Sequence, residues 1–155
     1  MIPAALSYQG VGRQLLLGLK YGNGRTLAGP LAARMARLVE PGSVDVVTWA
    51  PTSTRRARGR GFDQAELLAR AVAAELGVPC RRLLRRISRS RPQTGRSRAE
   101  RRIGPAFVGR RQWSNVRILV VDDVVTTGAT LRAAQRALLR AGAAEVRLLA
   151  AAATP

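Results

Sequence analysis

Four segments of the chain carry apolar residues at the three- and four-residue spacing of a helix that buries one face. Helices are therefore predicted around Leu15, Leu16 and Leu19, and over residues 26–39, 62–76 and 129–141. Gly77 and Gly142 follow the last two segments, and glycine is a common helix stop.

Short apolar runs with many β-branched residues separate these helices and predict buried strands. They cover residues 44–49, 80–84, 118–121 and 145–151. Strands that alternate with helices of this length indicate βαβ units and a mostly parallel sheet. The first 40 residues are predicted to be two helices that cap the sheet, and residues 85–105 show no periodicity. We expect one α/β domain over residues 1–155.

Composition narrows the chemistry more than the fold. The chain of 155 residues has a net charge of +18, and all its basic residues except Lys20 are arginine. With no His and a single Cys, Cys80, the usual zinc sites and the Ser-His and Cys-His nucleophile pairs are excluded. No apolar run is long enough to span a membrane, so we expect no membrane insertion and a cytoplasmic location. The charge predicts an anionic partner.

Residues 118–131 combine a strand, two acids, a Thr/Gly-rich turn and a helix start, in the order ILVVDDVVTTGATL. Asp122 and Asp123 are expected at the carboxyl end of the strand, where carboxylates can accept hydrogen bonds from the vicinal hydroxyls of a ribose. The turn offers hydroxyls, backbone N–H groups and a helix dipole to a phosphate, through Thr126, Thr127, Gly128, Ala129 and Thr130. Together these features describe a site for a 5-phosphoribosyl group.

A purely structural interpretation of the same residues remains open. Asp122 and Asp123 could cap the turn that follows the strand, with the threonines as helix N-caps. The length and order of the whole pattern favour the ligand site. No Walker A pattern occurs, so a P-loop nucleotidase is not supported.

The pattern at 118–131 resembles the PRPP-binding motif of type I phosphoribosyltransferases. Further segments resemble the ComF/GntX-like branch, in the family's order: residues 19–22 (LKYG), 60–67 (RGFDQAEL), 93–95 (QTG) and 97–101 (SRAER). The resemblance implies a Rossmann-like, doubly wound parallel sheet of about four to five strands, with a small helical hood at about 1–43 and a core at 44–155. It also implies Mg²⁺ bound with PRPP, and a link to DNA uptake. The four-Cys zinc ribbon with which members often begin has no counterpart here, as in a truncated or naturally single-domain form.

The resemblance also implies roles for single residues. Asp122 and Asp123 would be catalytic and hold the ribose hydroxyls, and Mg²⁺ would arrive with PRPP without direct protein ligands. Lys20 and Tyr21 would be hood contacts to the ligand. The pyrophosphate loop would comprise Thr52, Ser53, Thr54, Arg55 and Arg56. A mobile basic lid would comprise Arg91, Gln93, Arg96, Arg98 and Arg101.

Several positions depart from the family pattern. Trp49-Ala50-Pro51 stands where members tend to have Pro-Val-Pro, Asp63 replaces a usual Asn, and the segment 103–107 is a shortened form of the family's Asn followed by a Gly-Ala-Phe ending. Thr126 stands where purine-salvage members often carry an acid, which disfavours a hypoxanthine-type acceptor. These departures fall in loops that would handle pyrophosphate and acceptor, so binding of PRPP follows more directly than turnover, and whether the chain is an enzyme stays open.

Most of the positive charge lies in two segments. Residues 55–60 carry four arginines and residues 81–111 carry twelve, with Glu100 as the single acid. In an enzyme this field would neutralise departing pyrophosphate. In an accessory DNA-uptake factor it would bind single-stranded DNA, with PRPP as a regulatory ligand. Other interpretations stay open. The basic segments could be solvated loops in an arginine-biased sequence, and the protein could be a regulator that only senses PRPP. Lys20 could be a plain helix-terminal cation, and the chain could form a homodimer.

Overall fold

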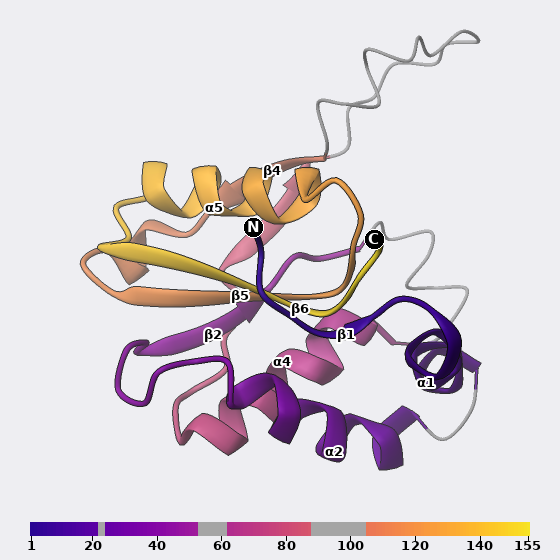
Figure 1. Ribbon diagram of the computed structural model, residues 1–155. Coiled ribbons are helices and arrows are strands. Elements are labelled where there is room, and N and C mark those ends of the chain that lie inside the picture. Colours follow the sequence, from indigo (N-terminus) through magenta and orange to yellow (C-terminus); the bar gives the residue numbers. More distant parts are fainter. Residues whose placement is uncertain (22–23, 53–61, 88–104) are drawn as a thin grey trace, which may run out of the picture.

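A parallel sheet with helices on both faces forms the centre of the molecule (Figure 1). The computed structural model describes residues 1–21, 24–52, 62–87 and 105–155. The strand order is β1 (Ala4–Ser7), β6 (Glu145–Ala153), β5 (Arg117–Val125) and β2 (Val46–Trp49), and every neighbouring pair is parallel. The expected α/β class is confirmed.

One face of this sheet is covered by α1 (Gly10–Tyr21), α2 (Gly24–Ala36) and α4 (Gln64–Leu76), drawn below the sheet in Figure 1. Leu16, Met35 and Leu68 are fully buried there. They belong to one apolar cluster with Leu119 and Val121 of β5. Every second residue of β5 therefore holds these helices against the sheet.

The opposite face is covered by α5 (Ala129–Arg140) and a small antiparallel pair, β3 (Leu84–Ile87) and β4 (Ala106–Gly109). The 3-10 helix η2 (Arg111–Trp113) follows β4. Leu131 and Leu138 of α5 pack with Ile118 and Val120 of β5. Among the described helices, none has the length and apolar composition needed to cross a bilayer.

Two parts of the sequence-based topology need correction. The strand expected at 80–84 is reduced to one parallel bridge between Cys80 and Val47, after which the chain leaves the sheet to form β3. The prediction of two helices for the first 40 residues is incomplete, because β1 precedes them and pairs with β6 at the edge of the sheet. The amino-terminal segment thus contributes to the core sheet as well as to its cover.

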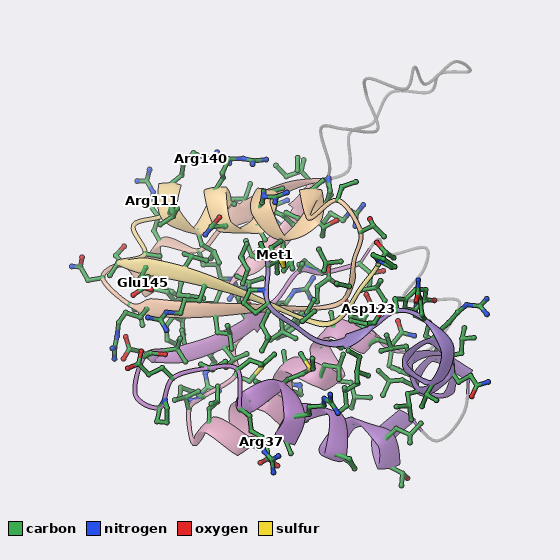
Figure 2. All side chains as sticks on the ribbon, viewed as in Figure 1. Met1, Arg37, Arg111, Asp123, Arg140 and Glu145 are labelled. Atoms are coloured by element: carbon green, nitrogen blue, oxygen red, sulfur yellow. The ribbon has the colours of Figure 1, made fainter. Side chains whose placement is uncertain are left out.

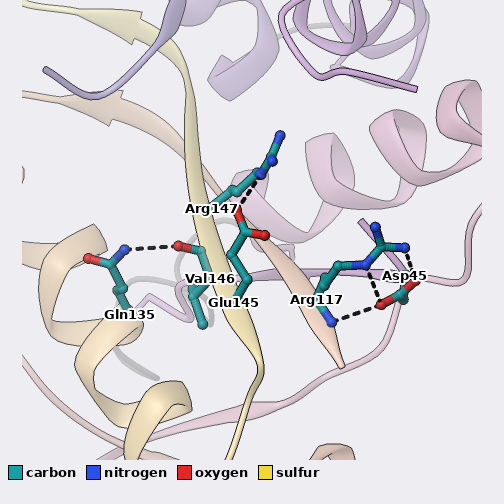
Figure 3. Close-up of polar contacts among 6 residues, drawn as sticks. All are labelled: Asp45, Arg117, Gln135, Glu145, Val146 and Arg147. Atoms are coloured by element: carbon teal, nitrogen blue, oxygen red, sulfur yellow. Dashed lines mark hydrogen bonds and ion pairs between the residues drawn. The ribbon is translucent and has the colours of Figure 1, made fainter. Parts of the chain in front are cut away.

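Ion pairs hold the amino ends of the central strands, away from the ends that carry the acid pair (Figure 3). Asp45 accepts hydrogen bonds from the backbone N–H of Arg117 at 2.9 Å and from its Nη2 at 2.6 Å. These contacts lower the pKa of the Asp45 carboxyl to about 2. Glu145 and Arg147 pair along β6 at 2.7 Å.

Candidate functional site

The central strand β5 extends beyond its neighbour β2 at the carboxyl edge of the sheet. Trp49, the last residue of β2, pairs with Val121. Asp122 therefore lies one residue past the last β2 pair and pairs only with Ala150 of β6. The expected end of the strand at Asp122 and Asp123 is wrong, because β5 continues to Val125. Beyond Trp49, the described part of β5 has no strand partner on the β2 side.

Asp122 is a partly buried carboxylate. Its Oδ1 accepts the backbone N–H of Asp123 at 2.9 Å. Burial raises the pKa of the Asp122 carboxyl well above its usual range, and the neighbouring charge of Asp123 raises it further. These causes favour the protonated carboxyl, and a ligand that brings positive charge or hydroxyl donors would favour the ionised form.

Asp123 forms an ion pair with a residue from the opposite end of the chain. Lys20 Nζ, in the last turn of α1, lies 3.3 Å from Asp123 Oδ2. Both side chains are largely enclosed, with exposed fractions of 18% and 21%. The Asp123 Oδ1 accepts the N–H of Val124 at 2.7 Å. Figure 2 shows Asp123 on the side of the sheet that faces α1, so this helix contributes the cation of the site.

The turn after β5 leads directly into the start of α5. Gly128 is the N-cap residue in the left-handed region, with φ of 76°, and as a glycine it offers no side chain to cap the helix. Thr126 and Thr127 are exposed, and the Thr127 hydroxyl accepts the N–H of Ala129 at 3.3 Å. The start of a helix at the end of a turn carries partial positive charge and suits a phosphate group.

Arg132 adds a positive charge to this turn. Its Nη1 donates to the carbonyl oxygen of Thr127 at 2.6 Å. A Cβ placed on Gly128 would lie 2.8 Å from the same Nη1 atom. The positive φ of Gly128 requires a glycine here, whereas the exposed Arg132 side chain could move away from a Cβ.

The loop after β2 is held by Asp63. The Asp63 Oδ2 accepts the N–H of Thr52 at 3.0 Å, while Oδ1 accepts the N–H of Ala65 at 3.1 Å and so caps α4. Burial raises the pKa of Asp63, and the three backbone N–H groups of Thr52, Ala65 and Glu66 oppose that rise. The charge of Asp63 also raises the pKa of Asp122, which places the two carboxyls within electrostatic reach of each other.

The structure brings part of the predicted site together. Lys20 contacts Asp123, the acid pair continues directly into the turn at 126–130, and Thr52 is tied to Asp63. Outside the described residues lie Ser53, Thr54, Arg55 and Arg56 of the predicted pyrophosphate loop, and Arg91, Gln93, Arg96, Arg98 and Arg101 of the predicted lid. The side chain of Tyr21 also lies outside the described part.

Two residues at this edge are absent from the site that the sequence predicts. Arg132 fits the exposed arginine stripe of α5 at four-residue spacing, so its contact with the preceding turn is hidden in the sequence. Asp63 stands just before a predicted helix, where Asp is a favoured N-cap. Its position before the helix could have predicted the cap of α4, but not the hydrogen bond with Thr52.

Comparison with known proteins assigns the family. A family model described as phosphoribosyl transferase domain matches residues 63–155. This range holds the acid pair, the turn, Asp63 and α5, but not Lys20 or Thr52.

Curated relatives are identical to this chain at about one in three of the aligned residues. Competence protein ComFC of Bacillus subtilis (strain 168) is 34% identical over 108 residues, which cover 68% of this chain and 43% of the relative. Competence protein F of Haemophilus influenzae is 32% identical over 95 residues, which cover 57% of this chain and 42% of the relative. The DNA utilization protein YhgH of Salmonella typhimurium is 33% identical, and 47% of its length is covered. The chain thus spans less than half the length of these relatives.

Solved structures agree on the fold. The glutamine phosphoribosylpyrophosphate amidotransferase of B. subtilis, complexed with ADP and GMP, superposes with a TM-score of 0.53 at 24% identity, covering 80% of this chain and 26% of that one. A purine phosphoribosyltransferase from Pyrococcus horikoshii superposes with a TM-score of 0.50 at 18% identity, covering 84% and 75% of the two chains. At these identities the likeness concerns the fold alone.

Proposed function

The chain belongs to the phosphoribosyltransferase domain family, and we propose that the carboxyl edge of its sheet binds PRPP together with Mg²⁺. The observation that carries the proposal is the continuity of β5 with α5. The partly buried acid pair at Asp122 and Asp123 is followed within a few residues by the start of α5, whose N-cap residue is Gly128. Carboxylates that accept hydrogen bonds from hydroxyl groups match the ribose of a 5-phosphoribosyl group, and the neighbouring phosphate site matches its 5′-phosphate.

Each part of the site has a role in this proposal. Asp122 and Asp123 accept hydrogen bonds from the ribose hydroxyls, and Lys20 balances the charge of Asp123. The turn from Thr126 to Thr130 binds the 5′-phosphate, with Arg132 adding positive charge beside it. Pyrophosphate lies at the loop that begins with Thr52 and includes Ser53, Thr54, Arg55 and Arg56. The basic segment with Arg91, Gln93, Arg96, Arg98 and Arg101 acts as a lid over it. Tyr21 is a hood contact to the ligand.

Mg²⁺ enters this proposal with PRPP and not as a resident of the protein. The described residues contain no cluster of three acidic, His or Cys side chains able to hold a metal. Lys20 Nζ lies 3.3 Å from Asp123 Oδ2, so the carboxylate of Asp123 already pairs with a cation of the protein itself. When bound with the ligand, the ion would neutralise charge on the pyrophosphate oxygens.

If transfer occurs, it follows from these positions. The bond between the anomeric carbon and pyrophosphate breaks, and its electron pair leaves with pyrophosphate. The lone pair of an acceptor nucleophile forms the new bond at the same carbon, through an oxocarbenium-like state. The fixed carboxylates hold the ribose while the charge develops. The acceptor is left open, and so is a role in which PRPP is only sensed.

Thermal denaturation tests the binding proposal. Millimolar PRPP with Mg²⁺ is expected to raise the melting temperature, because a ligand that binds the folded state stabilises it by mass action. Asp122→Asn combined with Asp123→Asn is expected to abolish this rise. The absence of any shift for the wild-type chain at millimolar PRPP would refute the proposal, and pyrophosphate release with a panel of bases and amines distinguishes transfer from sensing.

A second candidate function, binding of single-stranded DNA, is favoured by the surface on the α5 side. The described segments 81–87, 105–121 and 124–144 contain no Asp or Glu. Arg132, Arg136 and Arg140 are exposed along α5, with a rise of about 6 Å between successive members of the row. Figure 2 shows Arg140 and Arg111 on this side and Arg37 on the opposite side. An extended phosphodiester backbone fits such an acid-free arginine row.

A salt titration tests this candidate. A single-stranded oligonucleotide is expected to bind with an affinity that falls steeply as salt rises, because bound arginines release counterions. Arg136→Gln with Arg140→Gln should reduce the slope of log K against log salt by about one to two. Arg37→Gln on the opposite side is the matched control and should leave the slope unchanged. Weak binding that is indifferent to salt, or equal effects of both changes, would contradict the assignment.

A further inference from the structure

Lys20 reaches the acid pair from a helix whose position is fixed at two points. Leu16 and Leu19 of α1 are fully buried in the apolar cluster that joins this helix to the sheet. Near the start of the helix, a Cβ on Gly12 would collide with the carbonyl oxygen of Ser7, so only glycine lets the helix lie this close to the end of β1. Lys20 lies in the last turn of the same helix and is therefore carried by a firmly packed element.

The carboxylate of Asp123 is held from two sides. Lys20 Nζ lies 3.3 Å from its Oδ2, and the backbone N–H of Val124 donates to its Oδ1 at 2.7 Å. One contact comes from α1 and the other from β5 itself. Together they fix the orientation of the carboxylate relative to both the hood helix and the central strand.

We propose that Lys20 is a positioning residue, which acts on the ribose of the ligand through Asp123 and does not bind the phosphate groups. The inference rests on the proposed function, in which Asp123 accepts hydrogen bonds from ribose hydroxyls. It goes beyond that function by giving the hood helix a part in recognition of the ribose. It also differs from the direct contact with the ligand that the sequence leads us to expect for Lys20.

The enclosure of the pair favours this indirect role. The exposed fractions of the two side chains are 18% and 21%, so water and salt screen their attraction only in part. An ammonium that left Asp123 for a phosphate group would leave a largely enclosed carboxylate unpaired beside a polyanionic ligand, which is costly. The carboxyl-terminal end of α1 also favours a cation where Lys20 now lies, because the helix dipole places partial negative charge there.

Loss of Lys20 would change what Asp123 presents to the ligand. Without the ammonium, Oδ2 loses its partner, while Oδ1 keeps the N–H of Val124. The carboxylate is then free to turn, and its uncompensated charge repels the phosphate groups of PRPP. The proposal therefore predicts a loss of affinity that concerns the ribose-containing ligand.

Isothermal titration in the presence of Mg²⁺ tests this role with two probes, PRPP and inorganic pyrophosphate. Lys20→Met is expected to bind PRPP about tenfold more weakly, because the charge of Asp123 loses its partner. Pyrophosphate contains no ribose, and its affinity should be unchanged. The matched control is Arg13→Met, which removes an equal charge from an exposed position near the other end of α1. This variant should bind PRPP as the wild type does.

Unchanged PRPP affinity in a folded Lys20→Met variant would overturn the proposal. So would an equal loss for pyrophosphate and PRPP, because it would show direct contact with the phosphate groups. Failure of the wild-type chain to bind PRPP would instead refute the proposed function on which the inference rests.

Thermal denaturation without ligand tests the pair itself. Lys20→Met is expected to lower the melting temperature by about 2 °C or more in the wild-type background, because it leaves a largely enclosed carboxylate unpaired. In Asp123→Asn that carboxylate is already neutral, so the same change should lose this effect or reverse it. An equal decrease in both backgrounds would show that Lys20 does not act through Asp123.

Discussion

At the scale of one residue, Asp122 shows how a carboxyl with a raised pKa can lower the stability of the fold that holds it. Its folded-state pKa is raised, mainly by burial and then by the charge of Asp123. The favourable protonated form is present in full below the ordinary pKa of an aspartate. Its contribution to stability is lost as the pH rises through the folded-state value. At neutral pH, above the ordinary pKa of an aspartate, the raised pKa therefore costs stability.

Asp122→Asn is accordingly expected to raise the melting temperature at pH 8 by about 2 °C or more, the shift that roughly 1 kcal/mol produces in a domain of this size. The amide is neutral and keeps an oxygen for the N–H of Asp123. The gain should shrink toward pH 4, as the wild-type carboxyl becomes protonated. A lower melting temperature of the variant at pH 8 would contradict the burial argument.

Asp45 supplies the matched control for Asp122→Asn. Its pKa is lowered to about 2 by the hydrogen bonds of Arg117, so its contribution is present above the ordinary pKa and is lost as the pH falls toward 2. Asp45→Asn removes a favourable pair (Figure 3) and should lower the melting temperature at pH 8 or leave it unchanged. Both substitutions change the net charge by the same amount. Melting-temperature shifts of opposite sign would therefore reflect the different surroundings of the two carboxyls and not the net charge.

The sequence alone could locate some of the candidate site residues and not others. Asp122, Asp123 and the turn at 126–130 are contiguous, so a local pattern contains them all. Lys20 meets Asp123 from a helix near the other end of the chain, and the sequence alone favours a plain helix-terminal cation at this position. The bond between Asp63 and Thr52 depends on how the loop after β2 returns to α4, which no spacing rule predicts.

At the scale of elements, the contact between β4 and α5 depends on a glycine. A Cβ added to Gly109 would lie 2.8 Å from the carbonyl oxygen of Ala137 and 2.9 Å from the Cβ of Ala141. The backbone of α5 cannot yield without separating from the small sheet. Gly109→Ala should therefore destabilise the protein by about 1–3 kcal/mol.

Gly29 in α2 is the counterpart that isolates this packing effect. Apart from its chain neighbours, a Cβ there meets nothing within 4 Å. Pro30 follows it and disfavours the helical backbone for a residue with a Cβ, which offsets the gain of about 0.5–1 kcal/mol from a better helix former. Gly29→Ala should therefore change the stability less than Gly109→Ala does. Urea denaturation of both variants measures the two free energies of unfolding. Equal effects at the two glycines would show that the close approach of β4 to α5 does not restrict position 109.

The helices and central strands can be predicted because they are long enough to show a clear pattern of apolar residues. The elements that the sequence misplaces are too short to show one. Strand β1 consists of four residues without a β-branched side chain, and its strand character comes from pairing with β6. At Cys80 the chain pairs with β2 for one residue only. It then turns to the α5 side, where Leu83 and Leu84 are buried. Tertiary contacts, not local propensity, decide both cases.

At the scale of the whole molecule, the net charge of +18 is unevenly distributed over the fold. The described acids lie at the acid pair, at the amino ends of the strands, or on and beside α2 and α4, while the α5 side carries exposed arginines without acids. The acid pair thus lies at an edge between a balanced surface and a basic one. Such an arrangement attracts anions toward the carboxyl edge of the sheet, which agrees with a phosphate-rich ligand there.

The central claim is that this edge binds PRPP, and isothermal titration of PRPP into the full chain with Mg²⁺ tests it most directly. The predicted result is saturable binding with one site per chain. Binding should be lost in Asp122→Asn combined with Asp123→Asn and retained in Asp45→Asn. Absence of heat above dilution for a folded wild-type chain, or equal binding by the double variant, would contradict the account.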